Sequence, residues 1–384
     1  MSAPRLFFWV QHLLGIGHLR RAAALARAIA DDGFAVTIAS GGPAVPELDP
    51  GPVDFVQLPA ARATDSSFST IVDESGNKLD DTWWTIRRLA LARAFERARP
   101  DIVMIELYPF GRRAFRTELR PLLDACAEAQ PRIPVAVSLR DILVDKGRAD
   151  RIAETVSIVR AQIDRVLVHG DPSLFRLDET FPAAPEIAGK ISYTGYVVNR
   201  MPPRSTPSGE VLVSAGGGVV GHGLLECALA ARPLTQLADA PWRIVTGPQL
   251  PESDFAAIQQ QAAALTNVAV DRYRPDFQAL LASCRVSVSQ AGYNTLMEIL
   301  AAGTRAVVVP FAEAGETEQT WRARRLAERG LIGLVEADAM TPASLAAAID
   351  AADARKPGET PAIDLEGARK TAFLLRQTLE QARK

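Results

Sequence analysis

A histidine follows two glycines near the start of the chain, where the sequence changes character. The apolar run Leu6–Val10 predicts a strand, and the Ala-rich segment after His18 predicts a helix. Gly17 lets the backbone approach a ligand closely. A neutral imidazole, with an ordinary pKa of about 6.5, can take a proton from a substrate hydroxyl. We therefore predict His18 as a general base, with Gly15 and Gly17 beside the substrate. The alternative is a helix-capping or buried structural histidine.

The same turn does not fit a dinucleotide cofactor. The Gly-x-Gly-x-x-Gly fingerprint needs a third glycine, and Arg20 stands at that position. The next predicted strand ends in "TIASGG", without the acidic residue that would hold a ribose. Both physical requirements fail, so the sequence disfavours a nicotinamide cofactor.

A carboxylate and a phenol stand at the end of another predicted strand, "DIVMIEL". Glu106 closes this strand and Tyr108 follows it. Because strand ends of a parallel sheet meet at one edge, we expect both side chains to face the substrate. We predict that Glu106 orients His18 or acts as the base itself. A strand-end carboxylate in an ordinary loop is the alternative.

Three arginines fall on one face of the helix predicted after this strand. Arg112, Arg116 and Arg120 are spaced i, i+4 and i+8. A solvated face balanced by Glu118 and Asp124 is the simpler interpretation. Attraction to an anionic lipid or to a phosphorylated acceptor is the functional one.

A second glycine loop, "SAGGGVVGHG", runs from Ser214 to Gly223. It follows an apolar strand and opens a helix. Consecutive glycines free the backbone amides to face an anion at a helix N-terminus. This position favours phosphate binding over a merely flexible turn.

The stretch from Ser287 to Phe311 also predicts a strand, a turn and a helix. The strand ends at Gly292, and the helix begins near Asn294 and Thr295, where its N-terminus favours phosphate. Glu298 lies one turn further on, and its carboxylate can accept hydrogen bonds from two vicinal hydroxyls, such as those of a ribose.

Apolar strands alternate with helices along both halves of the chain, which is typical of parallel sheets covered on both faces. The segment 199–209, rich in Pro, Ser and Thr, reads as a linker. We therefore predict the α/β class, with two doubly wound Rossmann-like domains facing across a cleft. The predicted ranges are 1–198 for an N-terminal acceptor-binding domain and 210–384, including the last helix, for a C-terminal nucleotide-binding domain.

The composition of the chain excludes several classes of function. Lys and Arg total 43 against 45 Asp and Glu, a formal net charge of -2, so the basic excess of a nucleic-acid binder is missing. The three cysteines, Cys126, Cys227 and Cys284, have neither metal-ligand nor disulfide-framework spacing. No apolar stretch approaches the roughly 20 residues that span a bilayer. We expect a cytoplasmic protein, with possible peripheral contact at the inner face of a membrane.

Several of these segments together resemble one family. "QAGYNTLMEILAAGTRAVVVPF" resembles the nucleotide-sugar motif of MurG-like glycosyltransferases, which have the GT-B fold. "LLGIGHLRRAAALARAI", "YTGYVVNR", "SAGGGVVG" and "ETEQTWRARRLAERG" are similar to further segments of that family, in the same order. The resemblance covers most of the chain. The first glycine loop has fewer glycines than is typical of the family member that acts in peptidoglycan lipid synthesis. The chain therefore resembles a divergent relative of that enzyme.

The resemblance implies roles for individual residues. The glycines at 216–218 would meet a diphosphate, the helix start at 292–295 would lie near the phosphates, and Glu298 would bind ribose hydroxyls. Glu318 and Gln319 would face the donor sugar. Tyr273 and Arg274 would lie at the edge of a uracil and contact it largely through their backbone atoms. His18 would sit at the reaction centre. The full predicted donor set is Ser214, Gly216, Gly217, Gly218, Tyr273, Arg274, Gln290, Gly292, Asn294, Thr295, Glu298, Glu318 and Gln319.

The expected activity is therefore transfer of a sugar from a nucleotide-sugar, of UDP type, to an acceptor hydroxyl, with inversion and with neither metal nor cofactor. The acceptor is open between a lipid-linked molecule, a polysaccharide and a small molecule. A UDP-sugar 2-epimerase of the same fold and a non-catalytic nucleotide-sugar-binding protein are the alternatives. Formation of an epimerised sugar without acceptor would identify the first, and binding without turnover the second.

Overall fold

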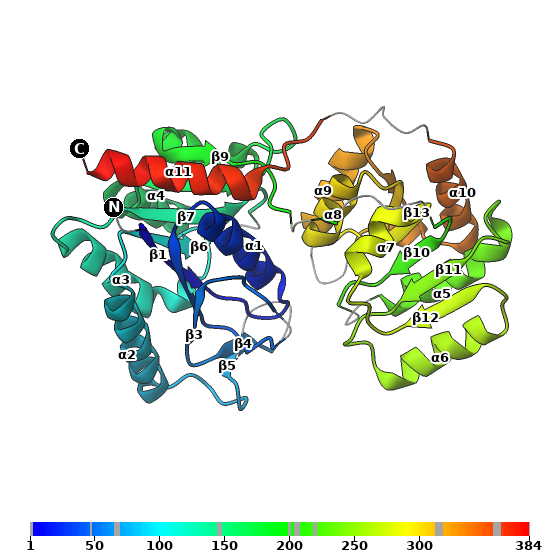
Figure 1. Cartoon of the computed structure of the whole chain (residues 1–384), viewed down its shortest axis with the longest axis horizontal. Helices are drawn as coiled ribbons and strands as arrows, with labels where there is room; N and C mark the ends of the chain where they lie inside the picture. Colours follow the sequence, from blue (N-terminus) through cyan, green and yellow to red (C-terminus); the bar gives the residue numbers. More distant parts are fainter. Residues whose placement is uncertain are drawn as a thin grey trace. The chain divides into compact units, whose positions relative to one another are not determined.

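The computed structural model of the chain describes residues 3–46, 48–64, 70–143, 148–198, 201–202, 208–217, 221–311, 318–355 and 362–383. The chain folds into two compact units (Figure 1). The first unit contains Met1–Val197 and Ile363–Lys384, and the second contains Val198–Ala362. Each unit has a sheet of its own.

The first unit is built on a seven-stranded parallel sheet. Its order is β3-β2-β1-β6-β7-β8-β9. The strands are β1 (Arg5–Val10), β2 (Ala35–Ser40), β3 (Asp54–Gln57), β6 (Ile102–Glu106), β7 (Val135–Arg140), β8 (Arg165–His169) and β9 (Ile191–Tyr193). A short antiparallel pair, β4 (Ala61–Ala63) and β5 (Ile71–Asp73), lies outside this sheet. The helices are α1 (Gly17–Asp31), α2 (Asp81–Ala98), α3 (Arg116–Glu128), α4 (Ala149–Gln162) and α11 (Gly367–Ala382).

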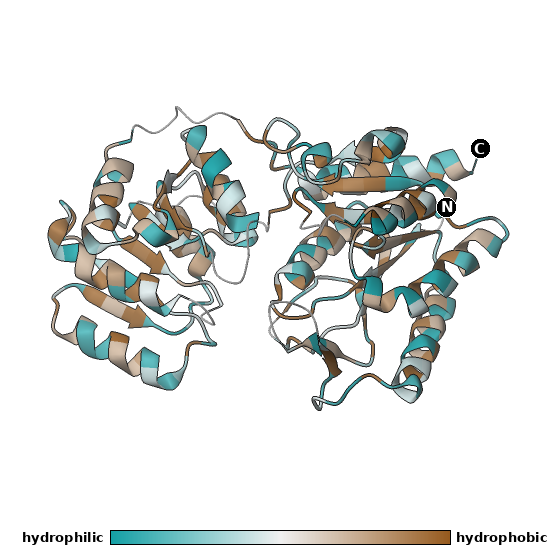
Figure 2. Ribbon diagram, turned by 180° about the vertical axis from the view of Figure 1, so that it is seen from behind, coloured by the Kyte–Doolittle hydropathy of each residue, from teal (hydrophilic) through white to brown (hydrophobic). Residues whose placement is uncertain are grey.

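The central strands of this sheet are apolar on both faces because helices cover both. Along β1, Phe7 and Trp9 point into one core cluster, whereas Leu6, Phe8 and Val10 point into another. Continuous apolar runs are what a doubly covered parallel sheet requires, since successive side chains alternate between its faces. Figure 2 shows this concentration of hydrophobic residues along the strands.

The last helix differs from the sequence-based expectation. We predicted it within the C-terminal domain of 210–384, but α11 belongs to the first unit and lies against α1 (Figure 1). Its apolar residues Ala372 and Leu375 join the core cluster that also contains Leu25 and Ile29 of α1. An apolar helix face does not encode which of two similar sheets it covers, so chain order misled the prediction.

A short segment ahead of the predicted linker also contributes to the sheet. Ile191–Tyr193 forms the edge strand β9, which pairs in parallel with β8. It is only three residues long and partly buried. A strand this short carries too little apolar periodicity to be distinguished from the linker that follows it.

The second unit is built on a six-stranded parallel sheet of order β12-β11-β10-β13-β14-β15. The strands are β10 (Val211–Ser214), β11 (Trp242–Val245), β12 (Val268–Asp271), β13 (Val286–Gln290), β14 (Ala306–Val309) and β15 (Gly333–Leu334). The helices are α5 (His222–Ala231), α6 (Glu252–Ala263), α7 (Phe277–Ser283), α8 (Tyr293–Ala302), α9 (Glu318–Glu328) and α10 (Pro342–Asp353). Its core gathers Val211, Val213, Val286 and Val288 of the two central strands.

Candidate active site

The strand order of each sheet reverses at one place. In the first sheet the chain runs outward from β1 to β2 and β3, then continues from β6 on the other side of β1. In the second sheet the equivalent place lies between β10 and β13. Ligands of open α/β sheets bind at the carboxyl ends of the strands beside such a reversal. A ligand site is therefore expected at each of these two places.

The first reversal brings His18 and Glu106 into contact. His18 is in the first turn of α1, directly after β1, and Glu106 is the last residue of β6. The Nδ1 atom of His18 lies 2.5 Å from Oε1 of Glu106. The carboxylate is 1% exposed and the imidazole 15% exposed. The structure thus joins the two side chains that we predicted to share one proton-transfer role.

Three arginines surround this pair. Arg21 of α1 donates from Nη2 to Oε1 of Glu106 at 2.8 Å. Arg112 holds its Nε 3.8 Å from Oε2 of Glu106 and donates to the carbonyl of Gln11 at 2.9 Å. Arg140, the last residue of β7, donates to Nε2 of His18. Helix α1, the ends of β6 and β7, and the segment after β6 therefore converge here, because β6 and β7 are neighbours in the sheet.

The Arg140 contact sets the tautomer of His18, because the competing contact of Arg21 with Nδ1 is long, at 3.5 Å. A guanidinium has only N–H donors, so Nε2 must accept with its lone pair. The ring proton then resides on Nδ1, and Nδ1–H donates to Glu106. A carboxylate that fixes a histidine in this tautomer leaves Nε2 as the basic nitrogen.

The charges around the pair shift both pKa values. Burial lowers the pKa of His18 to about 3; Glu106 opposes this shift, while Arg140 and Arg112 add to it. Burial alone would raise the pKa of Glu106, but His18, Arg112 and Arg21 together hold it well below its ordinary value. The pair is therefore a neutral imidazole beside an ionised carboxylate at neutral pH.

The other acceptor-side residues have different surroundings. Gly15 is exposed, and a Cβ built on it meets no atom within 4 Å. Gly17 begins α1, whose N-terminus has no side-chain cap. Tyr108, which we expected to face the substrate, is instead buried in the core of the first unit. It belongs to the large apolar cluster of the first unit, and sequence spacing alone does not show that burial.

The arginine stripe is not the face we expected. Arg112 precedes the helix and lies in the group of charged residues around the His18–Glu106 pair, which also contains Arg21 and Arg140 and is called the Glu106 cluster below. Arg120 instead donates to Glu154 of α4 at 2.7 Å. The predicted counter-charges also point elsewhere: Glu118 is buried and Asp124 accepts from Gln162. The prediction assumed one continuous helix, but the helix α3 starts only at Arg116.

The second reversal gathers the predicted phosphate loop. Ser214 ends β10, and Gly216 follows with a φ of 61°, which favours glycine. A Cβ on Gly221, at a φ of 146°, would lie 2.6 Å from Cβ of Ala215 and 3.4 Å from Nε2 of Gln290, at the end of β13. Gly217 accepts from the backbone N–H of Gln249 at 3.1 Å. Gly218 lies outside the described residues.

The start of α8 stands beside this loop in the fold, after β13. Gly292 is its N-cap and supplies no side-chain cap, and Asn294 and Thr295 are partly buried in the first turn. Glu298 is partly buried, and its Oε1 accepts from Nε2 of Gln278 at 3.1 Å. Gln278 thus orients the carboxylate that we predicted to bind a ribose.

At the start of α9, Glu318 is 6% exposed and accepts from Nη2 of Arg322 at 2.8 Å. The guanidinium of Arg322 lies 5.1 Å from the ring centre of Tyr293 in α8. Gln319 accepts from the backbone N–H of Phe311 at 3.3 Å. Arg322 therefore links the two predicted donor-side helices.

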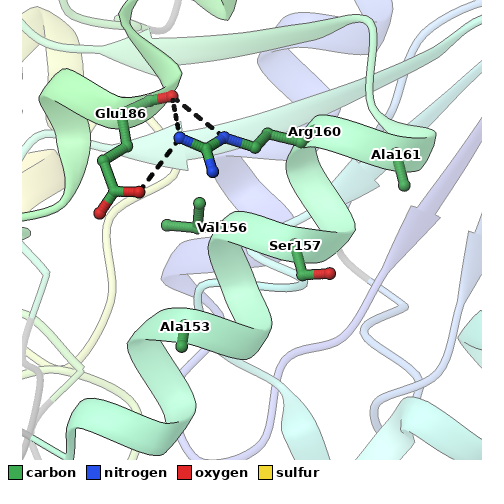
Figure 3. A pocket seen from close by; sticks show the side chains of 6 residues that line it. All are labelled: Ala153, Val156, Ser157, Arg160, Ala161 and Glu186. Atoms are coloured by element: carbon green, nitrogen blue, oxygen red, sulfur yellow. Dashed lines mark hydrogen bonds and ion pairs between the residues drawn. The ribbon is translucent and has the colours of Figure 1, made fainter.

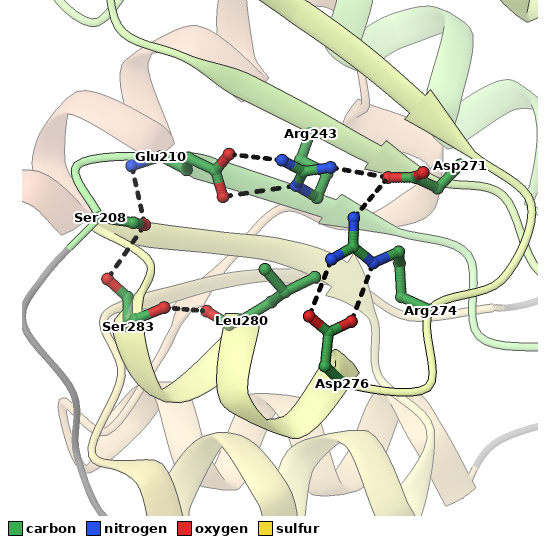
Figure 4. A network of polar contacts seen from close by, with 8 residues as sticks. All are labelled: Ser208, Glu210, Arg243, Asp271, Arg274, Asp276, Leu280 and Ser283. Carbon is green, nitrogen blue, oxygen red and sulfur yellow. Dashed lines mark hydrogen bonds and ion pairs between the residues drawn. The ribbon is translucent and has the colours of Figure 1, made fainter.

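The predicted base-edge residues lie after β12. Tyr273 is 57% exposed. Arg274 makes two bonds of 2.8 Å to Asp276 and lies 3.6 Å from Asp271, which also binds Arg243 (Figure 4). Since this guanidinium is engaged in its own loop, a contact with a base would come from the backbone.

A surface hollow of about 540 Å³ lies elsewhere in the first unit (Figure 3). Arg160 of α4 closes one side of it through bonds to the carbonyl and carboxylate of Glu186. None of the predicted site residues lines this hollow.

Sequence reasoning missed four residues that touch predicted site residues: Arg21, Arg140, Gln278 and Arg322. Two of these contacts carried a local signal. Glu318 and Arg322 are spaced i, i+4, and Arg21 lies three positions after His18, with its Nη2 3.5 Å from Nδ1. The remaining contacts join residues 20 to 122 positions apart, which no local pattern reveals.

The described part of the chain offers neither a metal centre nor a membrane-spanning helix. No cluster of three or more His, Cys, Asp or Glu side chains there is placed to hold a metal ion. No helix within those residues is both long enough and apolar enough to cross a bilayer.

The second reversal lies within a segment that matches a known protein family. Residues 212–371, which include the glycine loop, α8 and α9, match the glycosyltransferase family 28 C-terminal domain. The match ends within α11, so the family domain spans the crossing of the chain back to the first unit.

Curated relatives match parts of the chain. The UDP-N-acetylglucosamine--N-acetylmuramyl-(pentapeptide) pyrophosphoryl-undecaprenol N-acetylglucosamine transferase of Exiguobacterium sp. is 35% identical over 95 residues, 25% of this chain and 26% of that protein. The protein of the same description from Thiobacillus denitrificans is 31% identical over 150 residues, 39% of this chain and 41% of that protein. The matched segments thus span well under half of these relatives' lengths.

Solved structures match the whole fold. MurG of Acinetobacter baumannii aligns with a TM-score of 0.61 at 16% identity, over 97% of this chain and all of that one. The calicheamicin glycosyltransferase CalG4 aligns with a TM-score of 0.59 at 18% identity, over 99% and 95%. The chain therefore has the GT-B fold, and parts of its sequence are similar to the curated transferases named above.

Proposed function

We propose that the chain is a glycosyltransferase that moves a sugar from a UDP-sugar to an acceptor hydroxyl, with inversion and without a metal ion. The observation that carries this proposal is the His18–Glu106 pair at the reversal of the first sheet. A chain with this proton-accepting pair and a family 28 domain has the parts that such a transfer requires.

His18 is the proposed general base. Its Nε2 accepts the proton of the acceptor hydroxyl, and Nδ1–H remains bonded to Glu106. The buried carboxylate then faces an imidazolium, and this attraction stabilises the charge that develops during transfer. The acceptor oxygen forms its bond to the anomeric carbon from the face opposite the diphosphate, which inverts the configuration.

The second unit is the proposed donor site. As the bond between the anomeric carbon and the diphosphate breaks, its electron pair leaves with the nucleoside diphosphate. The backbone amides around Gly216 and Gly221, both at positive φ, and the N-terminus of α8, which has no side-chain cap, are suited to stabilise that negative charge. Glu298, held by Gln278, would accept the ribose hydroxyls, and Glu318 and Gln319 would contact the sugar.

The proposed acceptor and cellular location are inferred from the relatives. The curated relatives are named for a pyrophosphoryl-undecaprenol acceptor, so a lipid-linked acceptor reached by peripheral membrane contact is proposed here. A polysaccharide or small-molecule acceptor would agree equally with CalG4, which is named for calicheamicin. The proposed location is the cytoplasm.

The test is thermal denaturation with a panel of UDP-, TDP-, GDP- and ADP-sugars, followed by assay of nucleoside diphosphate release. Stabilisation by one UDP-sugar that Glu298→Ala abolishes and His18→Gln retains supports the donor assignment, because bound ligand stabilises by mass action. A shift only with another nucleotide overturns the UDP assignment. An epimerised sugar formed without acceptor, or binding with no turnover under any condition, would replace the transferase by one of the two alternatives.

A further inference from the structure

Arg140 occupies the one atom of His18 that the proposed reaction needs. The guanidinium donates to Nε2, and Glu106 already holds Nδ1. Both ring nitrogens are therefore engaged. A substrate hydroxyl can reach the basic lone pair only after the guanidinium leaves it.

The charges around the His18–Glu106 pair favour the contact between Arg140 and His18. They also indicate which kind of ligand could break that contact. Arg21 binds Glu106 and Arg112 faces it, while Arg140 donates to His18, so three cations lie around the pair. Among the described residues, the imidazoles of His12 and His169 also lie near Glu106, and burial lowers their pKa values. Among the described residues acting on His18, the only anion is thus Glu106. A negatively charged oxygen from a ligand would be a stronger acceptor for Arg140 than a neutral imidazole nitrogen.

We propose that Arg140 is a positioning residue that caps Nε2 of His18, and that an anionic group of the acceptor uncaps this nitrogen by drawing the guanidinium away. The base is then exposed only when the acceptor is bound. This inference rests on the proposed function for its catalytic meaning. The cap itself is a property of the first unit and can be measured without any substrate.

The acid–base chemistry of His18 agrees with a cap. Burial is the main cause of its lowered pKa, and Arg140 contributes in the same direction. A base works best when its pKa lies near the working pH. Withdrawal of the Arg140 cation removes one cause of the low pKa, so uncapping also makes His18 a stronger base.

The experiment is NMR of the full chain labelled with ¹⁵N-histidine. The chain has 4 histidines, and His18→Gln assigns the His18 signals. Long-range ¹H–¹⁵N spectra then report the tautomer and the pKa. We expect His18 to be protonated on Nδ1 at pH 7 in the wild type, and its pKa to rise in Arg140→Met. Arg140→Lys, which keeps the cation but not the planar fork, should give a smaller rise.

Arg132→Met is the matched control. Arg132 precedes the same strand at its opposite end and pairs with Asp164, away from His18. The second arm adds inorganic phosphate at constant ionic strength. Phosphate should move the His18 Nε2 resonance in the wild type and leave it unmoved in Arg140→Met.

Three results would overturn the inference. They are protonation of His18 on Nε2 in the wild type, an equal His18 pKa in wild type and Arg140→Met, and a phosphate response that persists in Arg140→Met. These readouts need no transfer reaction. A confirmed cap without any transferase activity would therefore refute the proposed function alone, and activity with an unchanged His18 pKa would refute the cap alone.

Discussion

Arg87 and Glu118 form an ion pair in which both side chains are completely buried. Nε of Arg87 lies 2.7 Å from Oε2 of Glu118, and Nη2 lies 2.9 Å from Oε1. Trp9 of β1 donates to the same carboxylate at 3.1 Å, and Arg87 also donates to Oε1 of Gln11 at 2.7 Å. Gln11 in turn accepts from Arg112, so the pair connects the core of the first unit to the Glu106 cluster.

Replacing Arg87 with Met should destabilise the first unit strongly. The substitution leaves Glu118 buried without its counter-charge, which typically costs about 3–5 kcal/mol. Urea unfolding monitored by tryptophan fluorescence measures the change. Arg88→Met is the matched control, because Arg88 is the exposed neighbour on the same helix. Equal stability of the two variants would show that the buried pair contributes little.

Glu106→Gln should reduce transfer far more than donor binding. The amide cannot hold the Nδ1–H tautomer by charge and cannot stabilise an imidazolium, and losses of about 10²–10⁴-fold in kcat are typical of such groups. Donor affinity should remain, since the predicted donor residues are in the second unit. Glu154→Gln, which disrupts a pair with Arg113 and Arg120, serves as control. Unimpaired kcat in Glu106→Gln would remove Glu106 from the mechanism.

Glu298→Ala should weaken nucleotide binding by about 1.5–3 kcal/mol, the usual worth of hydrogen bonds to a charged group. Isothermal titration with UDP and with 2′-deoxy-UDP separates the ribose contact from the rest. The wild type should discriminate between the two ligands, and the variant should not. Glu328→Ala, at the end of α9, is a control on the same unit. Discrimination that survives in Glu298→Ala would place the ribose elsewhere.

Acid should destabilise the fold through its buried imidazoles. Burial lowers the pKa values of His12, His18 and His169, so these rings stay neutral while the unfolded chain takes up protons below about pH 6.5. The unfolded state then binds more protons, and stability falls as the pH falls. Each ring contributes up to about 1.4 kcal/mol per pH unit. The loss is absent above pH 6.5 and for His18 continues to about pH 3.

Denaturant unfolding between pH 7 and pH 5 measures this effect before ordinary carboxylates titrate. His18→Gln should show a shallower dependence than the wild type, because one proton-linked group is missing. Identical slopes would mean that His18 ionises equally in the folded and unfolded states.

Leu375→Ala should loosen the first unit and leave the second unchanged. Leu375 is fully buried in the cluster that α11 shares with α1, and truncation of such a leucine typically costs about 2–5 kcal/mol. Hydrogen exchange locates the effect: amides of α1 should exchange faster, and those of α5 should not. Faster exchange in α5 alone would return α11 to the C-terminal domain, where chain order had suggested it.

The sequence by itself determined the two parallel sheets and the loops at their reversals. Apolar strands such as Leu6–Val10 have no polar face, so only a sheet covered on both sides can accommodate them. Glycines 216 and 221, both at positive φ, mark a turn that other residues rarely adopt. The pairing of His18 with Glu106 was also within reach, because each follows a strand that ends at the same edge.

Only the tertiary structure decided the contacts between residues that no local pattern relates. Arg140 reaches His18 because β7 lies next to β6 in the sheet, and strand order is not written in the period of a sequence. Nothing in the local sequence marks Arg87 or Tyr108 as buried, yet the structure buries both. The apolar face of α11 fits either sheet by composition, and only its packing against Leu25 and Ile29 selects the first. Local spacing specifies elements, whereas charge networks and helix partners depend on how those elements meet.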